Sequence, residues 1–285
     1  MSAAPALVSV VVPSYEHGPH IEEALRSVAL QRDVALELVV VDDASRDDSV
    51  AVVERLFDDH EFASRFERRL RLVVNETNQG AHAAINRGLC ESSGDFLTIL
   101  NSDDAYAPDR LSALLRLQRA SGAQLAMSRV VCMGTGADRD NWVRESFRLR
   151  RHQDGVERHP SIGFACMASN VAISSGNLFF SRALFEAVGG FDDLRYCHDW
   201  DFLLRAVLTT EPILVQRPLY RYRLHDTNSY RSLDGVAEVE TECVLRRFFE
   251  TMRLEPPVNR LAPSPHYWPG VFEYWMDRLG FWRYW

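Results

Sequence analysis

Two hydrophobic segments that each end in a pair of aspartates constrain the fold of this chain more than any other feature. One runs from Leu38 to Asp43, and the other runs from Phe96 to Asp104. Apolar and β-branched runs of this length are typical of buried parallel strands. Ligands of open α/β sheets bind at the carboxyl ends of such strands. Four carboxylates at one sheet edge would repel each other. A divalent cation that carries a diphosphate would satisfy them, because hard cations take carboxylate oxygens.

Strand and helix patterns alternate through the first half of the chain. Strands are predicted at residues 7–12, 36–41, 70–74 and 96–100, and the segments between them place apolar residues at helical spacing. This order with short links indicates an α/β fold with a doubly wound, mostly parallel sheet flanked by helices. Beyond about residue 120 the pattern is less regular, and the polar, arginine-rich residues 138–159 are predicted to form a loop.

Composition narrows the possible functions. The net charge of −8 argues against a protein that binds duplex nucleic acid, because such proteins usually carry a basic surface. The chain contains 32 arginines and no lysine, which excludes catalytic lysines and the phosphate-binding lysine of P-loops. Five scattered cysteines lack metal-binding spacing and are typical of a reducing compartment. We find no signal peptide and no apolar run of about 18 residues, so we expect a cytoplasmic protein.

The C-terminal segment, residues 231–285, is predicted to be a helical extension. Its aromatic and apolar residues recur at intervals of three to four residues, at Trp268, Phe272, Trp275, Leu279 and Trp282. The stripe would pack on the rest of the chain, attach to a membrane surface or mediate dimerisation. In each case we expect it to be covered, because an exposed apolar stripe of this size favours aggregation.

Seven short motifs follow one another between about residues 7 and 230. They are residues 10–15, 40–45, 78–88, 101–111, 189–192, 198–205 and 222–225. Together they resemble the family 2 glycosyltransferases, which have the GT-A fold. The resemblance implies an inverting enzyme that moves a sugar from a nucleotide-diphosphate donor, by default a UDP-sugar, to an acceptor hydroxyl. It also implies a divalent cation, Mn²⁺ or Mg²⁺, and a role in the synthesis of polysaccharides, glycolipids or other surface glycans.

The resemblance assigns the donor nucleotide to residues that follow the predicted strands. Tyr15 would stack on the base, and Asp43 would accept a hydrogen bond from the base imide. The residues implied in donor binding are Pro13, Ser14, Tyr15, Asp43, Gly80, Asn86 and Asp103. Gly80 would let the backbone approach the ligand. The alternatives are a plain turn after the first strand and a turn with a helix cap around residues 78–86.

The resemblance assigns the cation to Asp103 and Asp104, with His225 as a further ligand. The cation would neutralise the leaving nucleoside diphosphate as a Lewis acid. The chain departs from the common motif, since Asn101 stands where the first aspartate often does, and this leaves the roles of Asn101, Asp103 and Asp104 open. Alternatively, Ser102 and Asp103 cap the next helix.

Asp199 matches the acidic residue that serves as general base in the family. A sugar hydroxyl is a poor nucleophile until a carboxylate takes its proton, and one carboxylate without an enzyme nucleophile implies direct displacement with inversion. Asp201 is predicted to face Arg205 by the i, i+4 rule. The residues implied around the acceptor are Gly176, Asn177, His198, Trp200 and Asp201. The arginines at 144, 148, 150, 151 and 158 either bind an anionic acceptor or form a solvated loop.

The resemblance divides the chain into a glycosyltransferase domain, residues 1–230, and the extension. The nucleotide-sugar half would span about residues 1–110 and the acceptor half about 111–230. Expected partners are a nucleotide-sugar donor and a glycan, glycolipid or other hydroxyl acceptor, without nucleic acid. The aromatic helix would allow peripheral contact with the inner membrane face. A sugar-nucleotide pyrophosphorylase-like enzyme and a non-catalytic nucleotide-sugar binding domain are the alternatives.

Overall fold

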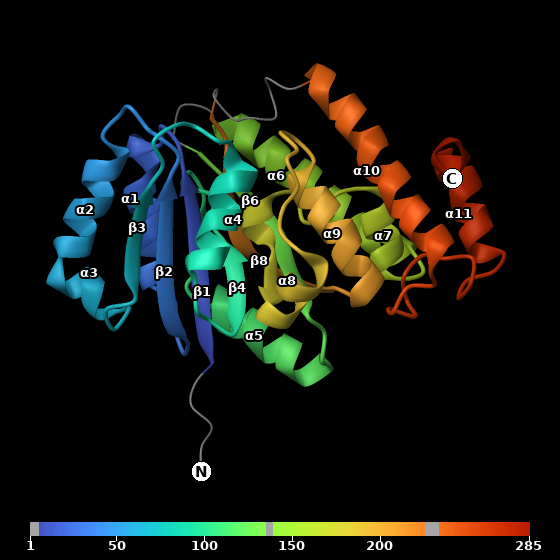
Figure 1. Ribbon diagram of the computed structural model, residues 1–285, viewed down its shortest axis with the longest axis horizontal. Helices are drawn as coiled ribbons and strands as arrows, with labels where there is room; N and C mark the ends of the chain where they lie inside the picture. Colours follow the sequence, from blue (N-terminus) through green and yellow to red (C-terminus); the bar gives the residue numbers. More distant parts are fainter. Residues whose placement is uncertain (1–5, 135–138, 226–233) are drawn as a thin grey trace, which may run out of the picture.

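An eight-stranded sheet lies at the centre of the computed structural model, which describes residues 6–134, 139–225 and 234–285 (Figure 1). The strand order is β3-β2-β1-β4-β7-β6-β8-β5. The strands are β1 (Leu7–Ser14), β2 (Ala35–Asp42), β3 (Leu70–Val74), β4 (Phe96–Ile99), β5 (Ala105–Tyr106), β6 (Leu125–Met133), β7 (Phe179–Ser181) and β8 (Ile213–Arg223). No helix in the described ranges is both long and apolar enough to cross a membrane.

The first half of the sheet is parallel, as predicted. β1 pairs in parallel with β2 and β4, and β2 pairs in parallel with β3. The second half is mixed, because β7 runs antiparallel to both β4 and β6 whereas β6 and β8 are parallel. The carboxyl ends of β1, β2 and β4 therefore meet at one edge, where ligands of such sheets bind.

Helices cover both faces of the sheet. They are α1 (Gly18–Ala29), α2 (Ser49–Asp58), α3 (His60–Ser64), α4 (Ala81–Glu91), α5 (Arg110–Ser121), α6 (Arg139–Asp154), α7 (Ile162–Ala168), α8 (Arg182–Val188), α9 (His198–Thr209), α10 (Asp234–Leu254) and α11 (Val271–Leu279). Alternate residues of β1 point to opposite sides. Val10 and Val12 join a hydrophobic cluster with α1, α2 and α5, whereas Val11 joins a second cluster with α4 and α9. Two cores therefore hold the sheet between them.

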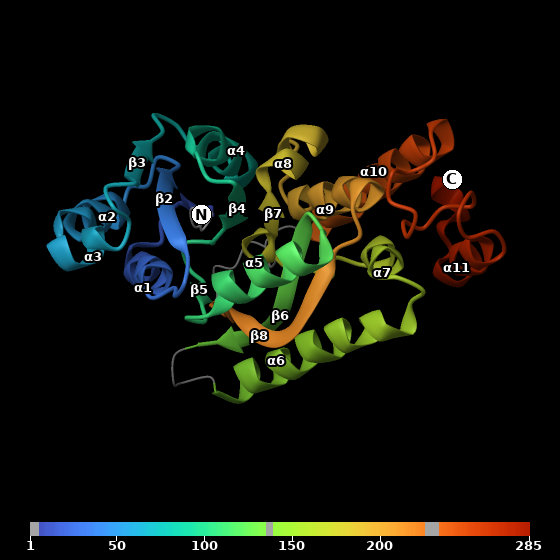
Figure 2. The same cartoon turned by 90° about the horizontal axis from the view of Figure 1, so that it is seen from below.

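The prediction of a loop at residues 138–159 is wrong for residues 139–158, which are helical, and residue 138 lies outside the described residues. Residues 139–154 form α6, which lies along β6 (Figure 2). Its anchor is polar: the buried Gln153 side chain accepts from Val130 N (2.9 Å) and donates to the carbonyl oxygens of Ser128 and Val171 (both 3.2 Å). This helix is rich in arginine and is anchored by a buried amide side chain. It therefore lacks the regularly spaced apolar residues by which an amphipathic helix is predicted from sequence.

The aromatic stripe near the C-terminus is buried in the body of the molecule. Phe272 and Trp275 belong to the same hydrophobic cluster as α7 and α9, and the His159 ring stacks on Trp275 with centroids 4.4 Å apart. Trp282 remains 44% exposed. Packing on the rest of the chain is therefore confirmed for most of the stripe, and the segments on the two sides of the predicted boundary at residue 230 share one core.

Candidate active site

Side chains from three separate loops converge at the carboxyl edge of the sheet. Asp103 follows β4, His17 lies between β1 and α1, and His225 follows β8. Each offers a ligand atom, and these atoms lie within 4.8 Å of one another. His225 Nε2 lies 2.8 Å from Asp103 Oδ2. One carboxylate with two imidazoles is a donor set that suits a divalent transition-metal ion, so these residues fit the cation that the family resemblance implies.

The electrostatics of Asp103 suit a cation ligand. Burial alone would raise the pKa of Asp103, but the hydrogen bond from His225 and the charges of His17 and His225 lower it. The carboxylate is therefore ionised and available. The alternative that Ser102 and Asp103 cap the next helix is wrong, because α5 begins at Arg110 and the preceding residue is Asp109.

His17 was not predicted from the sequence. It is a lone histidine in a loop, and no spacing relates it to residues 103 or 225, which lie far away in the chain. Its ring is oriented by Nδ1, which lies 2.8 Å from Ser102 Oγ, and its centroid lies 5.8 Å from that of His225. The His20 ring lies beside both histidines, 5.4 Å from His225.

Asp104 lies outside this cluster and is buried. Its Oδ1 accepts from Arg223 N at 2.7 Å, and its Oδ2 accepts from the Tyr220 hydroxyl and from Asn101 Nδ2. Burial and the neighbouring Asp103 charge raise the pKa of Asp104 well above its usual range. Both oxygens are thus occupied by hydrogen bonds that attach the loop after β4 to β8. The geometry favours Asp103 over Asp104 as the cation ligand.

Gly176 and Asn177 support the same buried network. A Cβ at Gly176 would overlap the Tyr220 hydroxyl, so only glycine leaves room for the tyrosine that holds Asp104. Asn177 is fully buried; its side chain donates to Ser128 O (2.8 Å) and Ala172 O (3.0 Å). Its carbonyl accepts from Arg110, which lies against the rings of Tyr106 and Tyr220. These contacts place Gly176 and Asn177 in the interior, outside the cavity described below.

The predicted donor-binding residues surround the ends of β1 and β2. Asp43 is buried and accepts from Asn75 Nδ2 (2.7 Å), Gln79 N (2.9 Å) and Gly80 N (2.8 Å). These bonds fix the turn before α4, in which Gly80 has φ +91°. Asp43 thus organises the loop beside the predicted base site.

Pro13, Ser14 and Tyr15 occupy the carboxyl end of β1 and the turn after it. Tyr15 is 42% exposed and free to meet a base. The Ser14 hydroxyl is buried without a hydrogen-bond partner among the described residues. A buried hydroxyl of this kind requires a partner, so it is an acceptor or donor available to a ligand or water.

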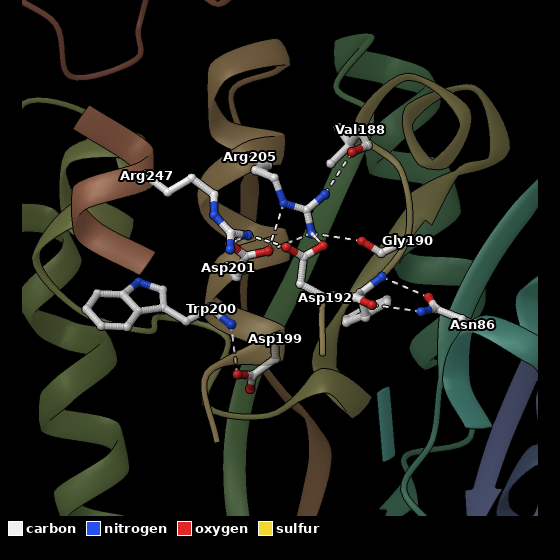
Figure 3. Close-up of polar contacts among 10 residues, drawn as sticks. Asn86, Val188, Gly190, Asp192, Asp199, Trp200, Asp201, Arg205 and Arg247 are labelled. Atoms are coloured by element: carbon white, nitrogen blue, oxygen red, sulfur yellow. Dashed lines mark hydrogen bonds and ion pairs between the residues drawn. The ribbon is translucent and has the colours of Figure 1, made fainter. Parts of the chain in front are cut away.

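Asn86 joins the two halves of the molecule. Its amide donates to Phe191 O (2.7 Å) and accepts from Phe191 N (2.8 Å), next to Gly190 (Figure 3). A Cβ at Gly190 would lie 2.5 Å from Asn86 Oδ1, which explains the glycine there. Asn86 therefore connects α4 to the segment that leads to α9, and its role here is to position that segment.

Asp199, in the first turn of α9, lies in the wall of a cavity of about 380 Å³. Its Oδ1 accepts from Trp200 N at 2.7 Å (Figure 3). Its Oδ2 accepts from Asn170 Nδ2 at 3.0 Å. Burial raises the pKa of Asp199, although the His198 charge and these hydrogen bonds oppose the shift. A carboxylate with a raised pKa and no ion pair among the described residues is suited to accept a proton.

His198 and Trp200 flank Asp199 in the wall of the same cavity. The Trp200 indole donates to Cys166 O at 2.8 Å, which fixes the ring between α9 and α7. Asn170 was not predicted from the sequence. It belongs to none of the seven motifs, and only the fold brings it to Asp199.

Asp201 lies on another face of α9 and points away from the cavity. It accepts from Arg205 Nε at 2.8 Å, as predicted, and from Arg247 of α10 at 3.3 Å (Figure 3). Arg205 also donates to Val188 O and Gly190 O. Asp201 thus fixes α9, α10 and the segment after α8 to one another, and its carboxylate is occupied.

Comparison with known proteins identifies the family of the chain. The profile of Glycosyl transferase family 2 matches residues 9–186. The chain belongs to this family. Membership of this family favours a glycosyltransferase over the two alternatives considered from the sequence, and the GT-A fold is confirmed.

Several proteins of known name are similar to part of the chain. Succinoglycan biosynthesis protein ExoO of Rhizobium meliloti is 35% identical over 120 residues, which cover 42% of this chain and 32% of that protein. GalNAc(5)-diNAcBac-PP-undecaprenol beta-1,3-glucosyltransferase of Campylobacter jejuni is 34% identical over 110 residues, 38% of this chain and 33% of that protein. The alignments thus span about a third of the length of these relatives.

Solved structures share the fold at low identity. The Staphylococcus aureus TarS 1-349 complex with UDP-GlcNAc has a TM-score of 0.65 at 20% identity, covering 85% of this chain and 65% of that one. The mannosyltransferase PcManGT of Pyrobaculum calidifontis, in complex with GDP-Man and Mn²⁺, has a TM-score of 0.60 at 20% identity, covering 98% and 74%.

Proposed function

We propose that this glycosyltransferase transfers a sugar, with inversion, from a nucleotide-diphosphate donor to an acceptor hydroxyl, and that Asp199 is the general base. The observation that carries the proposal is the contrast within α9. Asp199 faces a cavity without an ion pair to any described residue, whereas Asp201 is held by two arginines.

Asp199 would take up the proton in a single displacement. The acceptor hydroxyl loses its proton to the Asp199 carboxylate while its oxygen forms a bond to the anomeric carbon. The bond from that carbon to the diphosphate oxygen breaks, and the nucleoside diphosphate leaves with the electron pair. The hydrogen bonds from Asn170 and Trp200 N keep the carboxylate in one orientation.

The leaving group would be held at the other end of the site. His17, Asp103 and His225 would bind a divalent cation, which would supply Lewis-acid stabilisation of the diphosphate charge. Tyr15 and the loop organised by Asp43 lie where the nucleotide base is expected, at the ends of β1 and β2. TarS was solved with UDP-GlcNAc bound and PcManGT with GDP-Man bound. We take a UDP-sugar as the default donor of this protein.

The biological setting is part of this proposal. Named relatives act in succinoglycan biosynthesis and on a polyprenyl-linked glycan. We place the protein in surface-glycan synthesis, in the cytoplasm or at the inner membrane face.

Nucleotide binding tests the donor half of the proposal. UDP affinity is measured by calorimetry with Mn²⁺ and in chelator, for the wild type, Asp103→Asn and the exposed control Asp58→Asn. We expect Mn²⁺ to raise UDP affinity in the wild type and in the control. In Asp103→Asn the UDP affinity measured with Mn²⁺ should be more than about tenfold lower than in the wild type, because loss of even a hydrogen-bond partner of a metal ligand typically costs this much. Equal UDP affinity in chelator for the wild type would overturn the cation role.

A further inference from the structure

The cavity beside Asp199 is basic, although the protein as a whole is acidic. Four basic side chains line it, Arg148, His152, Arg195 and His198, and Asp199 is the sole acid among the lining residues. The whole chain carries a net charge of −8. The basic character of this wall is therefore local, and it lies beside Asp199, where the proposed function puts the acceptor.

The two arginines are available to a ligand. The Arg195 guanidinium has no hydrogen bond or ion pair to the residues that the structure describes. Arg148 is 77% exposed, and its nearest acid, Glu145, lies at 3.5 Å. An exposed ion pair of this kind is weak and yields readily to a better anion. Both guanidiniums can therefore donate to a phosphate in the bidentate manner that arginine favours.

The segment that carries Arg195 is held firmly in place. The Glu240 carboxylate of α10 accepts from the backbone amides of Arg195 (2.8 Å), Tyr196 (2.8 Å) and Cys197 (2.9 Å). Burial opposes ionisation of Glu240, but these three donors lower its pKa. This acid is thus occupied by the backbone and does not neutralise the arginine.

Two buried polar atoms beside Asp199 lack partners. His198 Nδ1 and Asn170 Oδ1 are both buried without a hydrogen bond among the described residues. Both side chains line the cavity. Buried polar atoms are nearly always hydrogen-bonded in native proteins, so these two are available to a polar ligand or to water inside the cavity, near the base.

We propose, building on the proposed function, that the acceptor carries a phosphate or diphosphate ester that binds Arg148 and Arg195 while its sugar hydroxyl reaches Asp199. His198 Nδ1 and Asn170 Oδ1 then hydrogen-bond to the sugar. The arginine-rich helix α6, which supplies Arg148, His152 and Leu149 to the cavity, thus forms part of the acceptor site. A lipid diphosphate and a free phosphorylated sugar share this chemistry.

Binding of simple anions tests the proposal. Geranyl diphosphate, geraniol and inorganic pyrophosphate are titrated by calorimetry into protein saturated with Mn²⁺ and UDP, with blank titrations into the same buffer, so that the donor site does not contribute. We expect geranyl diphosphate to bind the wild type, and geraniol not to bind. The dissociation constant should rise about tenfold in Arg148→Gln and in Arg195→Gln, the effect of losing a charge-assisted hydrogen bond. Arg116→Gln, an exposed control on α5, should bind as the wild type does.

The outcomes separate the possible ligands. Tighter binding of geranyl diphosphate than of pyrophosphate supports a lipid source, and equal binding supports recognition of the phosphates alone. Equal affinity of the wild type and both arginine variants, or binding of geraniol as strong as that of its diphosphate, overturns the proposal. UDP affinity is measured in the same variants, because loss of anion binding with intact UDP binding leaves the proposed function standing.

Discussion

Two pairs of aspartates, one after β4 and one at the start of α9, divide their tasks in the same way. In each pair one carboxylate lies outside the site and connects distant segments, Asp104 through Tyr220 and Arg223 and Asp201 through Arg205 and Arg247. The other, Asp103 or Asp199, faces the site. The comparison teaches that two acids close together in one motif need not share a role. One can stabilise the fold while the other is available to a ligand.

The two carboxylates that face the site, Asp103 and Asp199, differ in the direction in which their pKa is shifted. Asp103 has histidines beside it and its pKa is lowered, which suits a group that must stay ionised to bind a cation. Burial raises the pKa of Asp199, which suits a group that must take up a proton. The surroundings of each acid therefore match the task proposed for it.

The largest expected effect is on catalysis at Asp199. Asp199→Asn should reduce sugar transfer by about 10² to 10⁴, because general-base assistance is lost, while UDP affinity stays unchanged. In the wild type, transfer should fall as the pH drops through the raised pKa of Asp199, since only the ionised carboxylate accepts the proton. Rate measurements against pH check this, and a variant that loses UDP affinity in parallel with transfer would contradict the assignment.

The next largest effect concerns stability at Asp201. Asp201→Ala should lower the free energy of unfolding by about 2–3 kcal/mol, because Arg205 loses its buried carboxylate partner and Arg247 is left with Asp192 alone. Urea unfolding measures this against the exposed control Asp58→Ala, for which a change within about 0.5 kcal/mol is expected. A loss at Asp201 no larger than that of the control would remove the distinction between the two acids of α9.

A smaller effect is expected at Gly176, which supports the other pair. Gly176→Ala should cost about 1–3 kcal/mol, because the added methyl group displaces the Tyr220 hydroxyl from its place beside Asp104. Gly155→Ala is the matched control, since a methyl group there meets nothing within 4 Å. Equal unfolding midpoints for the two variants would show that Asp104 does not depend on Tyr220.

The smallest effect is a gain in stability. The raised pKa of Asp199 means that its charge destabilises the folded state at pH values above that pKa. Asp199→Asn should therefore raise the melting temperature at pH 8 by a few degrees at most. The gain should vanish below about pH 4, where the carboxyl group is neutral in both states. Calorimetry at the two pH values checks the sign; a lower melting temperature at pH 8 would contradict it.

Local patterns in the sequence were enough to predict much of this molecule. The strands β1 to β4 have long apolar runs, and Asp201 meets Arg205 one helical turn later, so both follow from spacing within one element. The aromatic stripe of α11 likewise has the period of a buried helix face.

Features that depend on distant contacts could not be predicted. His17 joins Asp103 and His225 only because three loops meet at one sheet edge. The antiparallel direction of β7 and the helix α6, which is anchored by Gln153, likewise depend on pairing with β6. Nothing in the sequence of α10 relates Glu240 to the amides before α9, or Arg247 to Asp201.

The most direct test of the division of tasks measures acceptor-dependent release of UDP and the melting temperature together for Asp103→Asn, Asp104→Asn, Asp199→Asn and Asp201→Asn. We predict that the variants of Asp103 and Asp199 lose transfer while keeping a melting temperature close to that of the wild type. Asp201→Asn should be the variant that melts earlier, since it leaves Arg205 and Arg247 without the ion pairs to this carboxylate. A stable Asp201→Asn without activity, beside an Asp199→Asn that transfers sugar at the wild-type rate, would contradict the account.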